Sequence, residues 1–180
     1  MESKVPKSGD KLRDQTLDLF TGLVAKAKRR GATAAEAMLV EGASMSVSQR
    51  LGKREDLTRS EGREAGIRVF FGKQQAMAAS TDLSPAALET LLDRTLAMAR
   101  EVPEEPYCGL ADPDLLANDY PDLDLCDTRE LSGDELYEIV ARTEDAARAV
   151  PGVTNSNGAS ASWGRGGLGL VTSDRSEEHT

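Results

Sequence analysis

Aromatic residues, cysteine and histidine are all scarce in this 180-residue sequence. Phe, Trp and Tyr together make up 4% of the residues, and there are two cysteines and one histidine, His179. Two cysteines are too few for a disulfide scaffold or a structural zinc site. A lone histidine supplies neither a Ser-His-Asp triad nor a paired-histidine zinc motif. Zinc-dependent hydrolysis of a substrate by these 180 residues alone is therefore close to excluded. We predict no catalytic, cofactor-binding or metal-binding residue.

Long apolar runs and excess positive charge are also missing. No segment approaches the roughly 18 apolar residues of a membrane span, and residues 1–10 contain no apolar stretch of signal-peptide length. The 22 basic and 31 acidic residues give a formal net charge of −9, the wrong sign for binding a phosphate backbone. We expect a cytoplasmic protein with reduced cysteines and with no membrane or direct nucleic-acid partner.

Apolar periodicity and capping residues predict three helices. Apolar residues recur at spacings of three and four over 10–30, which predicts the first helix. Ser84 followed by Pro85 predicts the start of the second, because proline at the first helical position loses no hydrogen bond. Ser132 with Glu135 three residues later forms a capping box and predicts the third.

Alternating apolar and polar residues predict short strands before the second helix and after the third. Glycines divide the first stretch at hairpin-like intervals, so its strands should be antiparallel neighbours. The order of elements predicts an α+β fold, an antiparallel sheet flanked by helices. The strands are expected at 34–41, 44–51, 54–60, 65–71, 74–80, 153–162 and 167–172.

Composition divides the chain into four segments. We expect an N-terminal α+β domain over 1–100 and an acidic, proline-rich connection over 101–131. A helix and strands over 132–174 begin a further, truncated domain. Residues 175–180 read like a translated sequencing-library adaptor, a non-native tail that follows a natural protein cut short near position 174; an ordinary polar tail is the alternative. The leucines expected to order the connection are Leu110, Leu115, Leu116, Leu123 and Leu125.

Two sequence clusters resemble functional motifs, and each has a structural explanation. Gly164–Gly169 matches G-x-G-x-x-G, but a strand-like segment follows it where a dinucleotide site needs a helix, so a glycine-rich hairpin is favoured. In the segment 80–84, Asp82 and Ser84 are expected to organise a turn and to cap the second helix.

The two cysteines are 18 positions apart. Cys108 has no basic neighbour in the sequence that would lower the pKa of its thiol. A nucleophilic role is therefore not predicted for it, and any role of Cys126 is left open.

Six segments, in this order along the chain, carry a resemblance to a known family: 46–56 (SVSQRLGKRED), 66–73 (GIRVFFGK), 79–84 (ASTDLS), 121–125 (PDLDL), 152–159 (GVTNSNGA) and 170–173 (LVTS). Together they resemble the N-terminal domain of the TldD/PmbA family. The segments 121–125 and 152–159 fit the PmbA branch, also called TldE, better than TldD. The family continues Leu-x-Thr-Ser with Asn-Gly, whereas Asp174 follows Ser173 here, which supports the truncation hypothesis.

The resemblance implies a function for the parent protein. TldD and TldE form a cytosolic zinc-metallopeptidase assembly, a hydrolase that carries out proteolysis of peptides or unfolded proteins. The family is associated with maturation of a peptide antibiotic, degradation of an antitoxin and a historical label as a modulator of DNA gyrase. The zinc ligands belong to TldD and lie beyond the N-terminal domain, and TldE lacks them. No family catalytic residue has a matching position here, so zinc is expected only in a TldD-like partner.

Three hypotheses follow. The leading one is the N-terminal fragment of a non-catalytic TldE/PmbA-like subunit that pairs with a TldD-like subunit as a heterodimer or higher assembly. The second is a fragment of a catalytic TldD-like metallopeptidase whose zinc helix lies downstream. The third is a stand-alone protein-interaction domain. Whether the parent is itself an enzyme, its substrate and its stoichiometry are left open.

Overall fold

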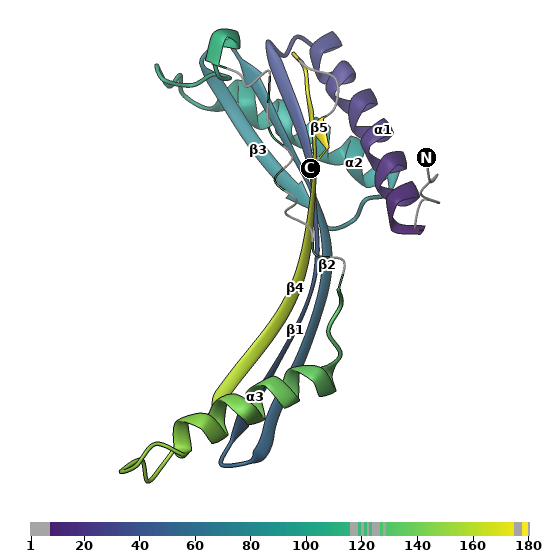
Figure 1. The fold of residues 1–180 in the computed structure, drawn as a ribbon. Coiled ribbons are helices and arrows are strands. Elements are labelled where there is room, and N and C mark those ends of the chain that lie inside the picture. Colours follow the sequence, from purple (N-terminus) through teal and green to yellow (C-terminus); the bar gives the residue numbers. More distant parts are fainter. Residues whose placement is uncertain are drawn as a thin grey trace. The chain divides into compact units, whose positions relative to one another are not determined.

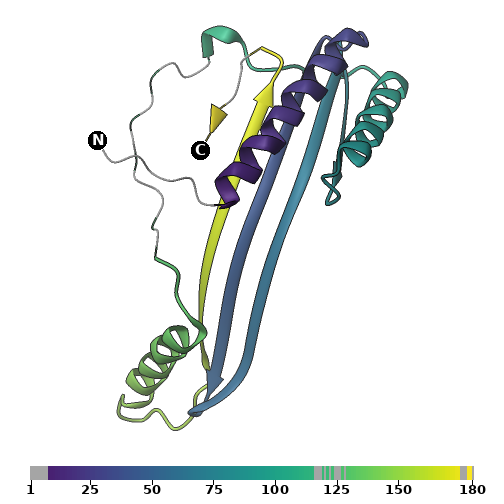
Figure 2. The same cartoon turned by 90° about the vertical axis from the view of Figure 1, so that its right-hand side faces the viewer.

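The computed structural model describes residues 8–115, 119, 121, 123, 127, 129–174 and 178–179 (Figure 1). One antiparallel sheet has the strand order β3-β2-β1-β4-β5, and Figure 2 shows β1 running opposite to β2 and β4. The α+β prediction is therefore confirmed. The elements are α1 (Ser8–Arg29), β1 (Ala34–Arg50), β2 (Lys53–Phe71), β3 (Gln74–Ser80), α2 (Pro85–Glu101), the 3₁₀ turn η1 (Pro113–Leu115), α3 (Gly133–Arg148), β4 (Ala159–Thr172) and β5 (Glu178–His179).

The predicted starts of the second and third helices are confirmed by their caps, whereas α1 begins at Ser8, two residues before the start predicted for the first helix. The Ser84 hydroxyl accepts a hydrogen bond from the Ala87 N–H at the start of α2. At the start of α3, Ser132 and Glu135 form both bonds of the capping box. The N–H of Ser132 holds the pKa of Glu135 below its usual value, because the bond stabilises the carboxylate form.

The strands are longer than predicted. The expected pairs 34–41 with 44–51 and 54–60 with 65–71 are the single strands β1 and β2. The hairpin expected at Gly164–Gly169 was wrong, because these residues lie inside β4. The strands continue because the glycines within them keep an extended backbone: none of them is among the glycines with positive φ. Glycine permits a turn but does not force one.

Two compact units divide the chain. The first comprises Met1–Glu41, Arg63–Asn118 and Gly167–Thr180, and the second comprises Gly42–Gly62 and Asp119–Gly166. The strands β1, β2 and β4 each contribute residues to both units. The domain boundaries expected after residues 100, 131 and 174 stay a prediction.

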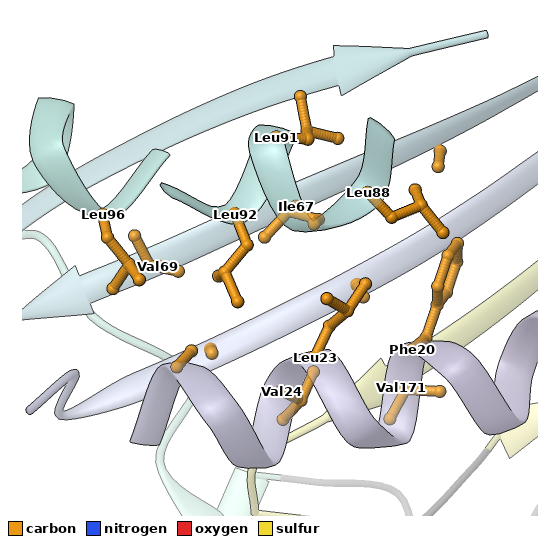
Figure 3. Packing of buried hydrophobic residues seen from close by; sticks show 14 of the residues in the cluster. Phe20, Leu23, Val24, Ile67, Val69, Leu88, Leu91, Leu92, Leu96 and Val171 are labelled. Carbon is orange, nitrogen blue, oxygen red and sulfur yellow. The ribbon is translucent and has the colours of Figure 1, made fainter. Parts of the chain in front are cut away.

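In the first unit, α1 and α2 share one hydrophobic core with the sheet. Figure 3 shows Phe20 of α1 pointing toward Leu88 of α2. Both side chains are almost fully buried, and burial of a side chain of this size contributes about 1.5–3 kcal/mol. The principal buried members of this core are Leu17, Phe20, Leu23, Val24, Leu39, Ile67, Val69, Leu88, Leu91, Leu92, Leu96 and Val171.

In the second unit, α3 packs on the sheet through a smaller core of Val47, Leu136, Tyr137 and Val140. The Tyr137 hydroxyl donates to the carbonyl of Asp56 at 2.7 Å, so the one polar atom of this side chain is satisfied.

The leucines expected to order the connection behave differently from that prediction. Leu110 is half-buried, but Leu115 and Leu123 are 80% and 64% exposed, so the expectation was wrong for these two. Leu116 and Leu125 lie outside the described residues. Prolines at 106 and 113 disfavour a helix through the described residues 102–115, and with it an apolar stripe that would bury Leu115.

Gly158 is a position where the fold requires glycine, and its substitution tests the packing of the second unit. Its φ is +98°, and an added Cβ would lie 2.7 Å from the carbonyl oxygen of Gln49. We expect Gly158→Ala to cost about 1–2 kcal/mol for the left-handed backbone plus about 1–3 kcal/mol for overpacking. Urea denaturation measures the loss in the free energy of unfolding.

Gly152 is the matched control for this substitution. Its φ is +90°, but nothing lies within 4 Å of an added Cβ. Gly152→Ala should therefore show the backbone cost alone. Equal losses for the two variants would contradict the close approach of Gly158 to β1.

Candidate functional site

The cluster at residues 80–84 has the structural role that the sequence predicted. The Asp82 carboxylate accepts a hydrogen bond from the Ser84 N–H at 2.9 Å, and the Asp82 N–H donates to the Ser80 hydroxyl at 3.0 Å. The bond from the Ser84 N–H lowers the pKa of Asp82, because it stabilises the ionised form. The cluster is therefore a turn followed by a helix cap.

Cys108 is buried, and the structure brings to it a cation that the sequence did not indicate. The Lys73 ammonium donates to the carbonyl oxygen of Cys108 at 2.9 Å. This bond involves the backbone and not the thiol, so Lys73 fixes the loop. The Cys108 residue as a whole is 4% exposed. Cys126 lies outside the described residues, and of His179 only the backbone is described.

The glycines at 164–169 lie where the strand passes close to other groups. A Cβ at Gly169 would meet the Leu17 side chain at 2.7 Å, and one at Gly167 would meet the Glu41 side chain at 3.1 Å. The segment is strand throughout, with no helix opening after it. It lacks the strand-turn-helix context of a phosphate-binding loop.

The second unit buries a charged side chain, that of Glu144 on α3, which was not predicted from the sequence. Glu144 is 1% exposed. Its oxygens accept hydrogen bonds from the N–H groups of Leu51 and Gly52, at 2.6 and 3.0 Å, and from the Gln49 side-chain amide at 3.2 Å. The carboxylate thus ties α3 to the turn between β1 and β2.

This turn has an unusual backbone. Leu51 has a φ of 50° and Gly52 a φ of 75°, the two successive positive values of a tight hairpin turn. A left-handed leucine costs about 1–2 kcal/mol. The Glu144 carboxylate offsets this cost by accepting hydrogen bonds from the N–H groups of both residues.

The pKa of Glu144 is lowered to about 2. The Gly52 N–H is the largest cause, supported by the Ser156 hydroxyl, the Leu51 N–H and the Gln49 amide, while burial acts in the opposite direction. The group is therefore a fixed negative charge at neutral pH. Since all its partners are internal donors, its role is to hold the hairpin.

A polar hollow of about 290 Å³ opens on the second unit. Its lining offers serine hydroxyls and one carboxylate, with no histidine, cysteine or lysine among the lining residues. Such a surface can exchange hydrogen bonds with a polar ligand, but it brings together no nucleophile with a histidine base. The lining residues are Ser46, Val47, Ser48, Asp56, Ser160, Ala161 and Ser162.

The residues that the structure describes show neither a metal-binding group nor a membrane-spanning helix. Within that part of the chain, no three His, Cys, Asp or Glu side chains gather in a way that could hold a metal ion. Among the helices described, none is both long and apolar enough to cross a membrane.

Comparisons with known proteins agree with the fold and identify the family. Residues 35–99 match the family model for PmbA/TldA metallopeptidase domain 1. The chain is 39% identical over 127 residues to the metalloprotease PmbA of Escherichia coli O157:H7, an alignment that covers 70% of this chain and 28% of that protein. The chain thus spans under a third of the length of this curated relative.

Solved structures of low sequence identity share the fold. A structure from Bacteroides thetaiotaomicron described as a proposed modulator of DNA gyrase aligns with a TM-score of 0.77 at 20% identity, covering 93% of this chain and 38% of that one. TldE from Thermococcus kodakarensis aligns with a TM-score of 0.71 at 16% identity, covering 90% of this chain and 36% of that one.

These findings define the class of protein: an N-terminal domain of the metallopeptidase-related type, built on a long antiparallel sheet. The chain carries an N-terminal domain of the TldD/PmbA family, as the sequence resemblance predicted.

Proposed function

We propose that this chain is the N-terminal part of a non-catalytic, PmbA/TldE-like subunit of a cytoplasmic TldD/TldE-type zinc metallopeptidase that acts on peptides or unfolded proteins. The observation that carries the proposal is the 39% identity to PmbA over 127 residues. The similarity of the fold to that of TldE supports the same branch.

The donor groups of the described residues do not fit zinc. Zinc sites in proteins use three or four Cys, His, Asp or Glu ligands, and the described residues bring no such group together. We therefore assign no catalytic step to this chain. Zinc would be held by the TldD-like subunit.

We assign this chain two contributions to the assembly: it supports the structure, and it binds peptide. Glu144 fixes the β1–β2 turn, and the serine-lined hollow offers hydroxyl groups that can bond to the amides of an extended peptide. Neither feature requires a reacting side chain. Both are consistent with a subunit that shapes a peptide-binding chamber.

A second candidate is that the parent protein is itself the metallopeptidase. The name of its relative, metalloprotease PmbA, favours this alternative. In that case the zinc ligands would lie in the part of the parent protein that corresponds to the portion of the relative outside the alignment, which covers 28% of that relative.

Association of the subunits tests the proposal. The full-length parent protein would be mixed with the TldD-like protein of the same genome and analysed by size-exclusion chromatography with light scattering. We expect a complex that contains both chains and has peptidase activity. A parent protein that stays separate from its TldD-like partner at micromolar concentrations would overturn the proposal.

A further inference from the structure

The segment 101–115 presents the two most exposed large apolar side chains among the described residues. Tyr107 is 95% exposed and Leu115 is 80% exposed. Single exposed apolar residues are common on protein surfaces. Here two such residues lie within nine positions of one segment, and one of them is an almost fully exposed aromatic ring. This combination is typical of a binding surface more than of ordinary surface composition.

The exposure of Tyr107 does not come from a loose chain. The Glu105 N–H donates to the Lys73 carbonyl at 2.9 Å, and the Lys73 ammonium donates to the Cys108 carbonyl at 2.9 Å. The Cys108 N–H bonds back to the Glu105 carbonyl at 2.9 Å, and the Tyr107 N–H bonds to the Glu105 carboxylate at 3.2 Å. These contacts pin the backbone on both sides of Tyr107 to the turn between β2 and β3.

Leu115 lies in the 3₁₀ turn η1, where the backbone makes local hydrogen bonds. Its N–H donates to the carbonyl of Asp112 at 2.8 Å, and the Asp112 carboxylate accepts from the Asp114 N–H at 3.1 Å. The Tyr107 side chain therefore projects from backbone that is already fixed by contacts with another element. Ordering a loop in advance lowers the entropy cost of binding.

The charge of the segment is of one sign. Residues 101–115 contain five carboxylates and no lysine, arginine or histidine; the acidic residues are Glu101, Glu104, Glu105, Asp112 and Asp114. Lys73, which approaches the segment, is bonded to its backbone. A partner surface that fits the segment must therefore carry positive charge around an apolar pocket, because charge complementarity selects the partner.

We propose that the segment 101–115 is a docking surface for a second protein subunit, which receives Tyr107 in an apolar pocket rimmed by lysine or arginine. Tyrosine is among the residues most often found to dominate binding energy at protein interfaces. The identity of this subunit rests on the proposed function: it would be the TldD-like chain. The docking chemistry itself rests only on the residues described above.

The test is the affinity of the full-length parent protein for the TldD-like protein, measured by biolayer interferometry. Tyr107→Ala is expected to weaken binding about tenfold or more, as for an interface hot spot. Tyr107→Phe should retain most of the affinity, because the pocket is apolar. Glu104→Lys should slow association and reduce its dependence on salt concentration, because one attractive charge becomes repulsive.

Val153 provides the matched control. It is 43% exposed and lies in the other unit, so Val153→Ala should leave the affinity unchanged. If the wild-type proteins associate but Tyr107→Ala and Glu104→Lys bind as tightly as wild type, the docking surface is wrong and the proposed function stands. If the wild-type proteins do not associate at all, both are overturned.

Another part of the parent polypeptide could cover Tyr107 in place of a second subunit, and a separate experiment distinguishes these two cases. Nitration of the isolated full-length protein by tetranitromethane, followed by mass spectrometry, reports the accessibility of Tyr107. We expect Tyr107 to be modified in the isolated protein and protected in the complex. Protection already in the isolated protein would overturn the proposal, since the pocket would then belong to the same chain.

Discussion

Replacing Phe20 by alanine is expected to lower the free energy of unfolding by about 3–5 kcal/mol, the usual cost of truncating a buried phenylalanine. Phe20 is fully buried on α1 and points toward Leu88 of α2 (Figure 3). Its removal leaves a cavity between both helices and the sheet. Because folded proteins are stable by only about 5–15 kcal/mol, the variant should unfold at a much lower urea concentration.

The preceding residue, Leu19, is the matched control for Phe20. Leu19 belongs to the same helix but is 40% exposed. Leu19→Ala should therefore change the free energy of unfolding by about 1 kcal/mol or less. Similar losses in the free energy of unfolding for the two variants would show that α1 does not bury the face that carries Phe20.

Replacing Glu144 by glutamine is expected to be the most damaging conservative change in the second unit. Glutamine has nearly the same shape, but it replaces one acceptor oxygen by an NH₂ donor. That donor would face the N–H of Leu51 or Gly52, which now bond to the carboxylate. An N–H left without an acceptor at this partly buried site is costly, so the thermal midpoint should fall by several degrees.

Glu138→Gln is the control for Glu144. Glu138 lies on the same helix and is exposed. We expect its substitution to leave the thermal midpoint nearly unchanged. If Glu144→Gln were equally harmless, the tie between α3 and the hairpin would not contribute to stability.

Acid should weaken the wild-type protein in a way that depends on Glu144. Its pKa is 4.5 in the absence of interactions and about 2 in the folded protein. A lowered folded-state pKa gives stability that is complete above about pH 5 and is lost as the pH falls from there toward 2. The stability difference between wild type and Glu144→Gln should therefore shrink over this range. A difference that stayed constant from pH 6 to pH 2.5 would contradict the assigned role.

Helices were predictable because their signals are local. The caps at Ser84 and Ser132 depend on residues within three positions of each other, and both are observed. The long strands were not predictable because glycine allows extended as well as turned backbone. Whether a glycine such as Gly42 turns depends on neighbouring strands that are distant in the sequence.

Glu144 shows what sequence patterns can and cannot reveal about the site. It lies four residues after Val140 on the buried stripe of α3, so a charged residue at an apolar position was a visible signal. Its partners could not be read from the sequence, because Leu51 and Gly52 are more than 90 positions away. The exposure of Leu115 could not be predicted either, because a proline-rich segment lacks the apolar periodicity that shows which face of a helix is buried.

The measurement that tests the central claim most directly is the metal content and peptidase activity of the full-length parent protein alone. The purified protein would be analysed by inductively coupled plasma mass spectrometry and incubated with unfolded casein and short peptides. We predict less than about 0.1 zinc per chain and no hydrolysis until the TldD-like protein is added. One tightly bound zinc per chain together with hydrolysis by the isolated protein would contradict the non-catalytic role and establish the parent as a metallopeptidase.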